Sequence, residues 1–580
     1  MPGLIKRFFL FLLFSIMGCL AYCQIGIGIN PPNPSAILHV QDTARGMLIP
    51  RMIAAQRANI QNPAEGLMVY QTDSPAGFWY FRSGQWVNTF PSNGGRSTLV
   101  LADTITNAEA QLKIANEVGP NTQEIRILRC SNLTTVDLSM LTNSLLEIYI
   151  DGNPVLQNVN LGNLTAIDGG IYVNNCPQLT TLNVHSLGRI GKSFTNTLIS
   201  GGDSYGLNIT GTGIQDISLP VVKQVAGQIY LRSNPAITNL SIPQLLSIQN
   251  ILIWDCPLLA NVSFQALKNL GVLNMTTPTE LATADFSSLM TAGALYLKGN
   301  QLSSISLPVL ANVVTQIDIS APQLASAVFP VLQVCPIFTV NAASQLSTVS
   351  APMLVTSKIK LAGGSLNAVN FNSLQTSTGI TITATTGSLA SLAFPSLQTS
   401  SYNSTALINV SGIGTVSFPL LYKADGFAAS QISSISLPLL DTIKNSLEIS
   451  NSPSLSAILF PVLKKSSQIS ITNCGMTAVS FPVFATNYEY NVSASGINIS
   501  ANPNLTSISW PNFQVMSGYG NLYNNKLPSS EVNALLAKFR TMTLQYVNLY
   551  LKQIPAAPPT GQGITDKNYL LGIGVYVDTD

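Results

Sequence analysis

The sequence predicts an all-β protein, a right-handed β-solenoid with coils of about 22 residues, preceded by a small β-rich module and followed by a mixed α/β cap. Three observations predict this fold class. A short phrase ending in Phe-Pro or Leu-Pro recurs along most of the chain, apolar and polar residues alternate within it, and turn residues separate the copies. No copy has the helical periodicity that would favour a helix.

The composition limits the function classes. Of 580 residues, 46% are hydrophobic and only 9% are charged, whereas charged residues make up roughly a quarter of a typical soluble domain. The exposed surface must therefore be rich in hydroxyl and amide groups. The formal net charge is only +2 and there is no basic stripe, which argues against nucleic-acid binding.

Residues 1–23 have the parts of a signal peptide. Lys6 and Arg7 precede a short apolar stretch, and small residues stand at the positions that a signal peptidase reads before Gln24. We expect cleavage before Gln24 and export to the extracellular space or the outer cell surface. The stretch is too short for a membrane anchor, the residues before Cys19 form a poor lipoprotein box, and no later segment predicts a transmembrane span.

Residues 24–95 have a different rhythm and are expected to form the small β-rich module. Its clustered aromatic residues allow a sugar-binding platform or the core of a hairpin around Ser83-Gly84. We favour the hairpin, because small β units rely on cross-strand aromatic pairs. The aromatic residues are Phe78, Trp79, Tyr80, Phe81 and Trp86.

The phrases of this module resemble those of a small module that opens many secreted bacterial surface proteins and some phage tail-fibre proteins. The resemblance runs from Gly26 to about Asn88 and rests on IGIGINPPNPSAILHV, GMLIPRMIAAQRANI, PAEGLMVYQTD and FWYFRSGQWVN. It implies a role in attachment or oligomerisation, and so allows a homo-oligomer formed through this module.

Residues 96–526 are expected to form the solenoid. A recurring proline slot sets its period, and about seventeen coils between residues 125 and 520, stacked at about 4.8 Å, would form a rod on the order of 80 Å long. Because proline cannot donate to a sheet, we expect the slot to be a corner of the coil. The slot holds Pro220, Pro243, Pro308, Pro330, Pro352, Pro395, Pro419, Pro438, Pro461, Pro482 and Pro511.

Each coil holds two alternating segments, which predict strands that face a continuous aliphatic interior. A single coil cannot bury its own apolar face, but a stack of coils can. For the coil around Pro461, the residues expected to point inward are Leu447, Ile449, Leu455, Ile458, Phe460 and Leu463.

The repeats resemble two related families. LYLKGNQL at 295–302 fits the leucine-rich-repeat core L-x-L-x-x-N-x-L, and ISITNCGM at 469–476 fits it with Cys474 in the asparagine place. SNPAITNLSIPQL at 233–245 is similar to the receptor L-domain, whose fold is a right-handed β-helix. Both resemblances imply architecture and leave the ligand open, because these motif positions are structural.

Two spacings exceed the period, from His185 to Pro220 and from Pro482 to Pro511. Insertions in solenoids form loops on one face and often carry binding, although they can also be loops without a role. If both insertions lie on one side of the rod, that side is expected to be a binding surface. The candidate ligand-binding residues are Ser193, Asp203, Tyr205, Tyr488 and Tyr490.

Residues 527–580 are expected to cap the open end of the solenoid. Residues 527–539 predict a helix with a serine N-cap and apolar positions at Val532, Leu535 and Leu536. A strand, a short helix and a final strand follow. This stretch resembles the C-terminal caps of secreted bacterial leucine-rich-repeat proteins.

The sequence predicts no catalytic, cofactor or metal site. His39 and His185 are the two histidines, and each is expected to be structural because neither lies in a nucleophile motif. Glu280 and Asp285 are the only close acidic pair between residues 220 and 420. A β-helical polysaccharide-degrading enzyme, which needs clustered acidic residues, is therefore the less favoured alternative.

Five cysteines remain after the predicted cleavage, and no disulfides are expected. Cys130, Cys176, Cys256 and Cys474 share one slot of the coil, and Asn153 holds that slot between the first two. Cys130 and Cys176 are two coils apart, which separates their Cα atoms by roughly 9–10 Å. That distance exceeds the limit of about 7 Å for a disulfide, so buried thiols in a turn ladder are expected.

These observations predict a non-enzymatic surface or extracellular binding protein, in which the solenoid presents a long polar face to a protein or glycan ligand. The alternative is a structural rod or a tail-fibre-like component, in which the solenoid is a spacer.

Overall fold

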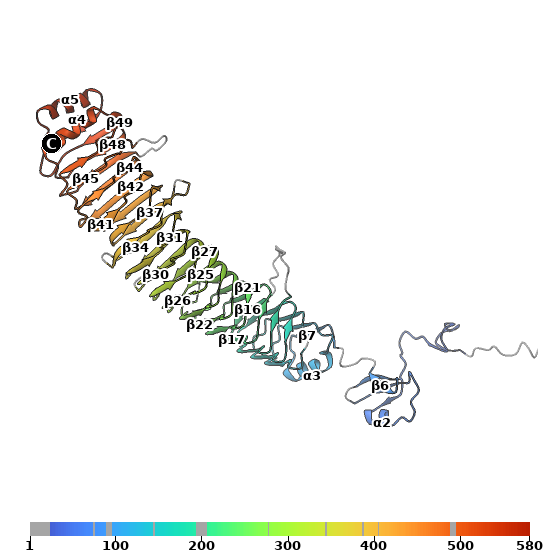
Figure 1. The fold of residues 1–580 in the computed structure, drawn as a ribbon. Helices are drawn as coiled ribbons and strands as arrows, with labels where there is room; N and C mark the ends of the chain where they lie inside the picture. Colours follow the sequence, from blue (N-terminus) through green and yellow to red (C-terminus); the bar gives the residue numbers. More distant parts are fainter. Residues whose placement is uncertain are drawn as a thin grey trace, which may run out of the picture. The chain divides into compact units, whose positions relative to one another are not determined.

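The computed structural model describes residues 24–73, 76–88, 95–142, 145–192, 206–276, 278–342, 345–385, 388–403, 405–487 and 495–580. The chain divides into two compact units, with the boundary between Gly95 and Arg96 (Figure 1).

The first unit contains two small sheets and one short helix in its described residues. Strands β1 and β2 pair in parallel. The second sheet has the order β3-β4-β5-β6, in which β4, β5 and β6 are antiparallel neighbours. The elements are β1 (Ile25–Ile27), β2 (Leu38–Val40), β3 (Arg51–Met52), α2 (Ala54–Ala58), β4 (Met68–Gln71), β5 (Gly77–Arg82) and β6 (Gln85–Asn88).

The predicted hairpin is present in this unit. Strands β5 and β6 are joined by Ser83 and Gly84, which both have positive φ, of 52° and 80°, as a two-residue hairpin turn of the primed type requires. The rings of Phe81 and Trp86 meet edge to face across the strands, with centroids 5.5 Å apart. The hairpin interpretation of the aromatic cluster is therefore confirmed.

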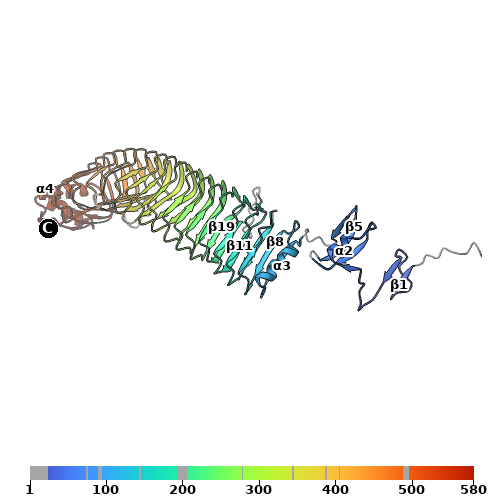
Figure 2. The same cartoon turned by 90° about the horizontal axis from the view of Figure 1, so that it is seen from below.

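The second unit is a β-solenoid of about 20 turns of ~22 residues, which confirms the predicted fold class. Its longer side is one continuous parallel sheet that runs from the first coil to the last, here called the long sheet (Figure 2). Its strands are β7 (Thr98–Ala102), β8 (Glu124–Leu128), β10 (Glu147–Asp151), β12 (Ala166–Ile167), β13 (Ile171–Cys176), β15 (Arg189–Ile190), β16 (Gly206–Thr212), β18 (Gln224–Val225), β19 (Gln228–Arg232), β21 (Ser247–Trp254), β23 (Asn269–Met275), β25 (Thr291–Lys298), β27 (Asn312–Ser320), β29 (Val334–Ala342), β31 (Thr356–Gly363), β33 (Thr376–Ser377), β34 (Ile380–Ala384), β36 (Thr399–Ser400), β37 (Leu407–Ser411), β39 (Lys423–Ala424), β40 (Gly426–Ser430), β42 (Thr442–Ser452), β44 (Lys465–Cys474), β46 (Gly496–Ser500), β48 (Val515–Asn521), β49 (Thr543–Tyr550) and β50 (Tyr576–Asp578).

The opposite side consists of short parallel strands in five small sheets. The strands, sheet by sheet, are β9 (Thr135–Asp137), β11 (Asn158–Asn160) and β14 (Thr181–Asn183); β17 (Asp216–Ser218), β20 (Asn239–Ser241), β22 (Asn261–Ser263) and β24 (Thr283–Asp285); β26 (Ser304–Ser306), β28 (Ser326–Val328), β30 (Thr348–Ser350) and β32 (Ala368–Asn370); β35 (Leu389–Ala393), β38 (Ile413–Ser417) and β41 (Ser434–Ser436); and β43 (Ile458–Leu459), β45 (Ala478–Ser480) and β47 (Ser507–Ser509).

The coil around Pro461 shows how alternation builds the interior. All six residues predicted to point inward are buried, none with more than 4% of its surface exposed. Pro461 follows β43 in a turn, as predicted. In the coil of Pro243 the N–H of Leu245 donates to the carbonyl of Ile242 at 3.3 Å. Pro243 is thus the second residue of a β-turn, where the fixed φ of proline is favourable.

The residue before the proline slot contributes an aromatic column to the core. Phe394 and Phe418 are fully buried and stack with centroids 5.3 Å apart. Phe460 and Phe481 stack in the same way at 5.2 Å. Aromatic pairs of this geometry add to the burial free energy, so the column links successive coils.

Both ends of the solenoid are covered by helices. At the start lies α3 (Asn107–Glu117), a helix that the sequence analysis did not predict, with Ala110 and Ile114 buried. Its capping box pairs Thr106 with Glu109, and the T-N-A-E phrase was the signal that could have revealed it. At the other end lie α4 (Ser529–Arg540) and α5 (Gln562–Gly572).

Two details of the predicted cap need correction. The predicted serine N-cap is wrong, because Pro528 holds the N-cap position of α4 and makes no side-chain cap. The stack is also longer than the predicted seventeen coils, because β7 precedes the recurring phrase and β49 and β50 of the cap pair in parallel with β48 and each other. The predicted apolar positions Val532, Leu535 and Leu536 are buried.

The five cysteines in the described residues are buried and free, so no disulfide is present among them. Burial raises the pKa of the Cys335 thiol to about 12 and that of Cys474 to about 11. Thiols of this kind are poor nucleophiles. The cysteines therefore serve as small buried side chains, as predicted.

Buried asparagines alternate with cysteines in the shared slot. The N–H of Cys130 donates to Asn153 Oδ1 at 2.8 Å, and Asn153 Nδ2 donates to the carbonyl of Ile127 at 2.9 Å. Asn300, which the leucine-rich-repeat motif places in an equivalent position, is instead exposed, and Gly299 is buried before it. The motif match at 295–302 therefore locates a coil correctly, but Asn300 is not one of the buried asparagines of the shared slot.

Candidate binding surfaces

The five candidate residues of the two insertions all lie outside the described residues. They are Ser193, Asp203, Tyr205, Tyr488 and Tyr490. The described residues beside the insertions nevertheless show where each insertion leaves the solenoid.

Both insertions leave the solenoid at the same step of the coil. Before the insertions, Arg189 and Thr486 belong to one register row of the long sheet, connected strand by strand. After them, Leu207 and Ile497 belong to a second row. We call the step between these two rows the insertion corner.

A shorter loop occupies the same corner between β36 and β37. The carboxylate of Asp425, 1% exposed, accepts hydrogen bonds from Ser401 Oγ at 2.9 Å, from Tyr402 N at 2.8 Å and from Ala406 N at 3.3 Å. The loop presents Tyr402, which is 57% exposed. Sequence reasoning missed it, because the spacing from Pro395 to Pro419 is only slightly longer than the period.

A fourth feature of the insertion corner is Tyr546 in β49. It lies between Thr543, which pairs with Val515 of the first row, and Leu549, which pairs with Gly520 of the second. Tyr546 has a φ of 56° and is 99% exposed. The register of β48 and β49 shifts at this point, as expected where a β-bulge adds a residue.

The outward side of the long sheet carries paired aromatic residues. Tyr149 and Tyr172 lie opposite each other on β10 and β13, with ring centroids 6.2 Å apart. Tyr230 and Trp254 meet edge to face at 5.5 Å on β19 and β21. A further pair, Tyr550 and Tyr576, lies on β49 and β50 at 5.6 Å.

The outward side of the short strands is a polar ladder. Asn160 Nδ2 donates to Asp137 Oδ1 at 3.0 Å, and Asn183 Nδ2 donates to Asn160 Oδ1 at 2.9 Å. The backbone N–H of Ser139, above all, holds the pKa of Asp137 below its usual range. Because these groups bond to one another along the rod, the ladder stabilises the stack.

The first unit has an unusual distribution of apolar residues. Among the described residues from 24 to 88, Val69 is the only apolar side chain in the buried core. Large apolar side chains are exposed instead, at 38–84% of their surface. They are Ile25, Ile27, Ile37, Leu38, Val40, Met47, Leu48, Ile53 and Met68.

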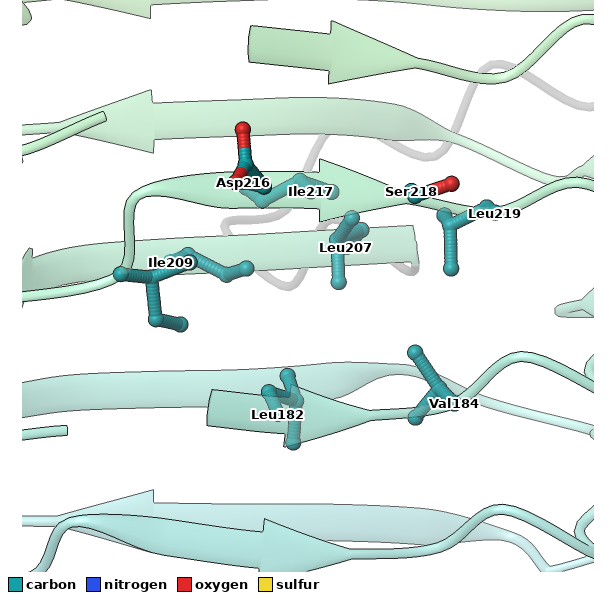
Figure 3. Close-up of a pocket in the computed structure, with 9 residues that line it drawn as sticks. Leu182, Val184, Leu207, Ile209, Asp216, Ile217, Ser218 and Leu219 are labelled. Carbon is teal, nitrogen blue, oxygen red and sulfur yellow. The ribbon is translucent and has the colours of Figure 1, made fainter. Parts of the chain in front are cut away.

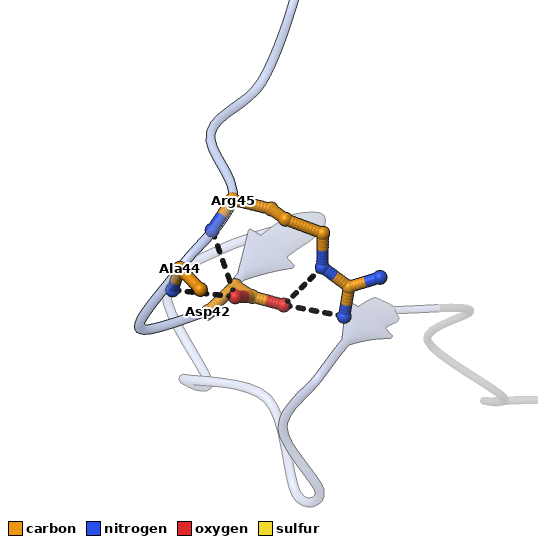
Figure 4. A network of polar contacts seen from close by, with 3 residues as sticks. All are labelled: Asp42, Ala44 and Arg45. Atoms are coloured by element: carbon orange, nitrogen blue, oxygen red, sulfur yellow. Dashed lines mark hydrogen bonds and ion pairs between the residues drawn. The ribbon is translucent and has the colours of Figure 1, made fainter.

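Polar and cation–π contacts between neighbouring residues fix the local conformation in parts of the first unit. Asp42 accepts hydrogen bonds from the N–H groups of Ala44 at 2.8 Å and Arg45 at 2.9 Å, and pairs with the Arg45 guanidinium at 2.7 Å (Figure 4). The N–H of Ala44, above all, lowers the pKa of Asp42. The guanidinium of Arg57 in α2 lies 3.6 Å from the centre of the Trp79 ring in β5 of the second sheet.

The two histidines lie in structural contacts. His39 Nδ1 accepts from the N–H of Asn33 at 3.1 Å, and His185 Nδ1 lies 2.8 Å from Asn183 Oδ1 in the polar ladder. Across the described part of the chain, no three His, Cys, Asp or Glu residues are grouped so that they could hold a metal ion. Asp285 accepts from the N–H of Ser287 at 3.0 Å and so caps a corner.

One small cavity lies inside the solenoid, where the short-strand ladder is interrupted between β14 and β17 (Figure 3). Its volume is about 10 Å³, which is about the space of one water molecule. Apolar side chains such as Leu182, Leu207 and Ile209 dominate its lining. The cavity is therefore a packing gap and not a ligand site.

Comparison with known families gives a match in the N-terminal part of the chain. Residues 26–106 match the family described as "Phage tail like trimerisation region". The match begins at the residue where the predicted resemblance to phage tail-fibre modules begins and includes every exposed apolar residue named above except Ile25. The description of this family names trimerisation.

Among the solved structures that match, two illustrate the similarity, both at low scores. A leucine-rich repeat protein from Bacteroides ovatus is 10% identical, with a TM-score of 0.19, over 70% of this chain and 94% of that chain. A chain of the Toll–Spätzle complex of Drosophila is 12% identical, with a TM-score of 0.15, over 78% of this chain and 80% of that chain. Because scores this low do not establish a shared fold, the solenoid assignment rests on the strand register.

No curated protein matches the chain. In the described residues, no helix is long and apolar enough to cross a membrane.

Proposed function

We propose that the protein is an exported, non-enzymatic binding protein that assembles as a trimer. The first unit joins three chains, and each solenoid presents a long face to a protein or glycan ligand at the cell surface or outside the cell. The export step rests on the predicted signal peptide, and the non-enzymatic role rests on the scarcity of acidic residues in the repeats.

The exposed apolar residues of the first unit are the observation that carries the proposal. In its described residues this unit buries Val69 and exposes nine larger or comparable apolar side chains, so that part has no buried apolar core of its own. Exposed apolar surface of this kind is typical of a protein–protein interface. The match to a trimerisation region supports association with further copies of the same chain.

The insertion corner supports the binding role. The described residues that flank the two insertions, the loop of Tyr402 and Tyr546 all lie at the same step of the coil, although they come from coils far apart in sequence. Loops on a rigid scaffold are the usual carriers of binding. A trimer would present three such corners, and multivalent attachment increases the overall avidity for a repetitive surface.

A structural rod or tail-fibre-like component is the second candidate. The description of the matched family as phage tail like favours it. In that case the trimer would form, but the solenoid would bind no ligand. The two candidates therefore differ in ligand binding and share the assembly.

Mass measurement by light scattering on residues 24–580 tests the assembly. We expect a trimer for the wild type, and dissociation for a double variant with Ile37→Asp and Leu48→Asp, because charged side chains at 79% and 84% exposed positions would be buried between chains. Leu112→Asp is the matched control, since Leu112 is 65% exposed on α3 of the other unit. A monomeric wild type at micromolar concentration would refute the proposed assembly.

A further inference from the structure

The outward side of the last three long-sheet strands carries a compact group of tyrosines around one asparagine. Asn548 of β49 pairs with Tyr519 of β48 on one side and with Tyr576 of β50 on the other. Tyr550 shares the outward side of β49 with Asn548, two residues away. The Tyr550 and Tyr576 rings are in contact, with centroids 5.6 Å apart.

Tyr546 belongs to the same strand and is the most exposed large apolar or aromatic side chain among the described residues, at 99%. Its φ of 56° lies in the left-handed region, which is unfavourable for a residue with a large side chain. The position thus costs stability and gains no burial in return. Strain that folding does not explain points to a functional role.

Tyr519 is held in place by two neighbouring coils. Gln468 Nε2 donates to the Tyr519 hydroxyl at 2.8 Å across 51 residues of sequence. A Cβ atom at Gly496 would lie 2.6 Å from the Tyr519 ring, so the glycine lets the ring lie against the neighbouring strand. A ring held in this way loses little freedom on binding a ligand.

The surface around these residues carries charge only at its edge. One register row reads Gln468, Gly496, Tyr519, Asn548 and Tyr576, and the adjacent row reads Ser470, Asn498, Asn521, Tyr550 and Asp578. The charge at the border is paired within the protein, because Lys552 Nζ lies 2.9 Å from Asp578 Oδ1.

We propose that Tyr519, Tyr546, Asn548, Tyr550 and Tyr576, here called the tyrosine platform, bind a neutral polysaccharide. Aromatic faces stack against the C–H faces of sugar rings, and amide and hydroxyl groups bond to sugar hydroxyls. A surface with these groups and no unpaired charge fits an uncharged, hydroxyl-rich chain. The assignment rests on the proposed binding function and specifies its ligand class and place.

Affinity electrophoresis of residues 24–580 in native gels tests the platform, with dextran, laminarin, mannan and xylan as neutral probes and polygalacturonate as the charged probe. We expect the wild type to be retarded by a neutral probe and not by polygalacturonate. Tyr546→Asn and Tyr550→Ala should each weaken that retardation by about tenfold, the loss typical of an aromatic anchor. Tyr422→Ala, at a 47% exposed tyrosine elsewhere on the rod, should bind as the wild type does.

The melting temperature of Tyr546→Asn adds a second measurement, which should stay the same or rise while polysaccharide binding falls. Asparagine tolerates positive φ, so Tyr546→Asn should melt at the same or a higher temperature while binding falls. A variant that loses both stability and binding would indicate a structural role for Tyr546 and overturn its place in the platform.

The outcomes separate the two proposals. If no neutral probe retards the wild type, or if Tyr546→Asn and Tyr550→Ala are retarded as strongly as the wild type, the platform assignment is wrong. The mass of the same samples reports the trimer independently, and capture of a protein ligand by all variants would leave the broader binding function standing without the platform.

Discussion

At the scale of single residues, one inward slot of each coil decides how the backbone turns. At the C-terminal end this slot is filled by Cys474, Asn502, Asn525 and Gln553 in successive coils. The N–H of Cys474 donates to Asn502 Oδ1 at 2.9 Å, and the N–H of Asn502 donates to Asn525 Oδ1 at 3.0 Å. Gln553 Nε2 donates to the carbonyl of Leu522 at 2.8 Å. Each side chain satisfies backbone groups that water does not reach.

Replacement of one residue in this inward slot tests its role in satisfying the buried backbone groups. Asn502→Ala should destabilise the solenoid by about 1–3 kcal/mol for each buried group left unpaired, which includes the Cys474 N–H and the Ile471 carbonyl. Chemical denaturation measures the loss. Asn504→Ala is the control, because exposed Asn504 makes one bond to the Gly475 carbonyl at 3.2 Å and should cost far less. An equal loss of unfolding free energy in both variants would contradict the role proposed for the inward slot.

At the scale of elements, the cap closes the solenoid through paired helices. Phe539 of α4 contacts Trp510 of the last corner, with ring centroids 6.1 Å apart. Arg540 at the end of α4 pairs with Asp566 of α5 at 2.7 Å, and Gln562 donates to the same carboxylate oxygen at 3.0 Å. The Asp566 side chain is only 4% exposed. This ion pair therefore links the two helices.

The pH dependence of the cap follows from this pair. The hydrogen bond from Arg540, above all, lowers the pKa of Asp566. A carboxylate with a lowered pKa in the folded state adds stability above its unfolded pKa, near 3.9, and that stability is lost as the pH falls through the folded pKa. The difference in melting temperature between wild type and Asp566→Asn should thus be full at pH 7 and shrink below about pH 4.

Asp441→Asn provides the comparison for this experiment. Asp441 pairs with Lys464 at 3.4 Å, and both side chains are exposed, at 37% and 67%. Exposed pairs contribute little, so this variant should differ little from the wild type at neutral pH. A difference for Asp566→Asn that stays constant from pH 7 to acid would contradict the assigned role of the Arg540 pair.

At the scale of the whole molecule, the described solenoid is a stack whose stability depends on its neighbours and its ends. Each coil contacts the next through strand pairing and side-chain columns such as Phe394 and Phe418. The first coil is covered by α3 and the last by α4 and α5. Repeat proteins need such ends, because an open end exposes both apolar surface and unpaired strand groups.

Two deletions test this dependence. Deletion of residues 527–580 should expose β48 and the core beside it, so we expect aggregation, measured by light scattering during refolding. Deletion of residues 24–95 leaves α3 in place and should yield a soluble protein that is no longer trimeric. A soluble, monodisperse protein after the first deletion would show that α4 and α5 are not needed as a cap.

The sequence by itself determined the coil. The inward residues, the corner at Pro461 and the shared cysteine slot follow from short patterns that recur about every 22 residues, so each copy supports the others. The helix α3 occurs only once, so no other copy in the repeat could reveal it. Asn300 is exposed although the motif places it in the buried slot, and this local departure within one turn is not visible from the repeat.

Only the tertiary structure decided which surfaces belong together. One corner holds the two insertions, the loop of Tyr402 and Tyr546. This is known only because the pairing of each long-sheet strand with the next can be followed residue by residue over many coils. The strain at Tyr546 and the grouping of Tyr519, Asn548 and Tyr576 depend on a bulge and on pairing between strands more than twenty residues apart. Alternation along one strand tells which side chains face outward, but the neighbours of each are set by the strands stacked on either side.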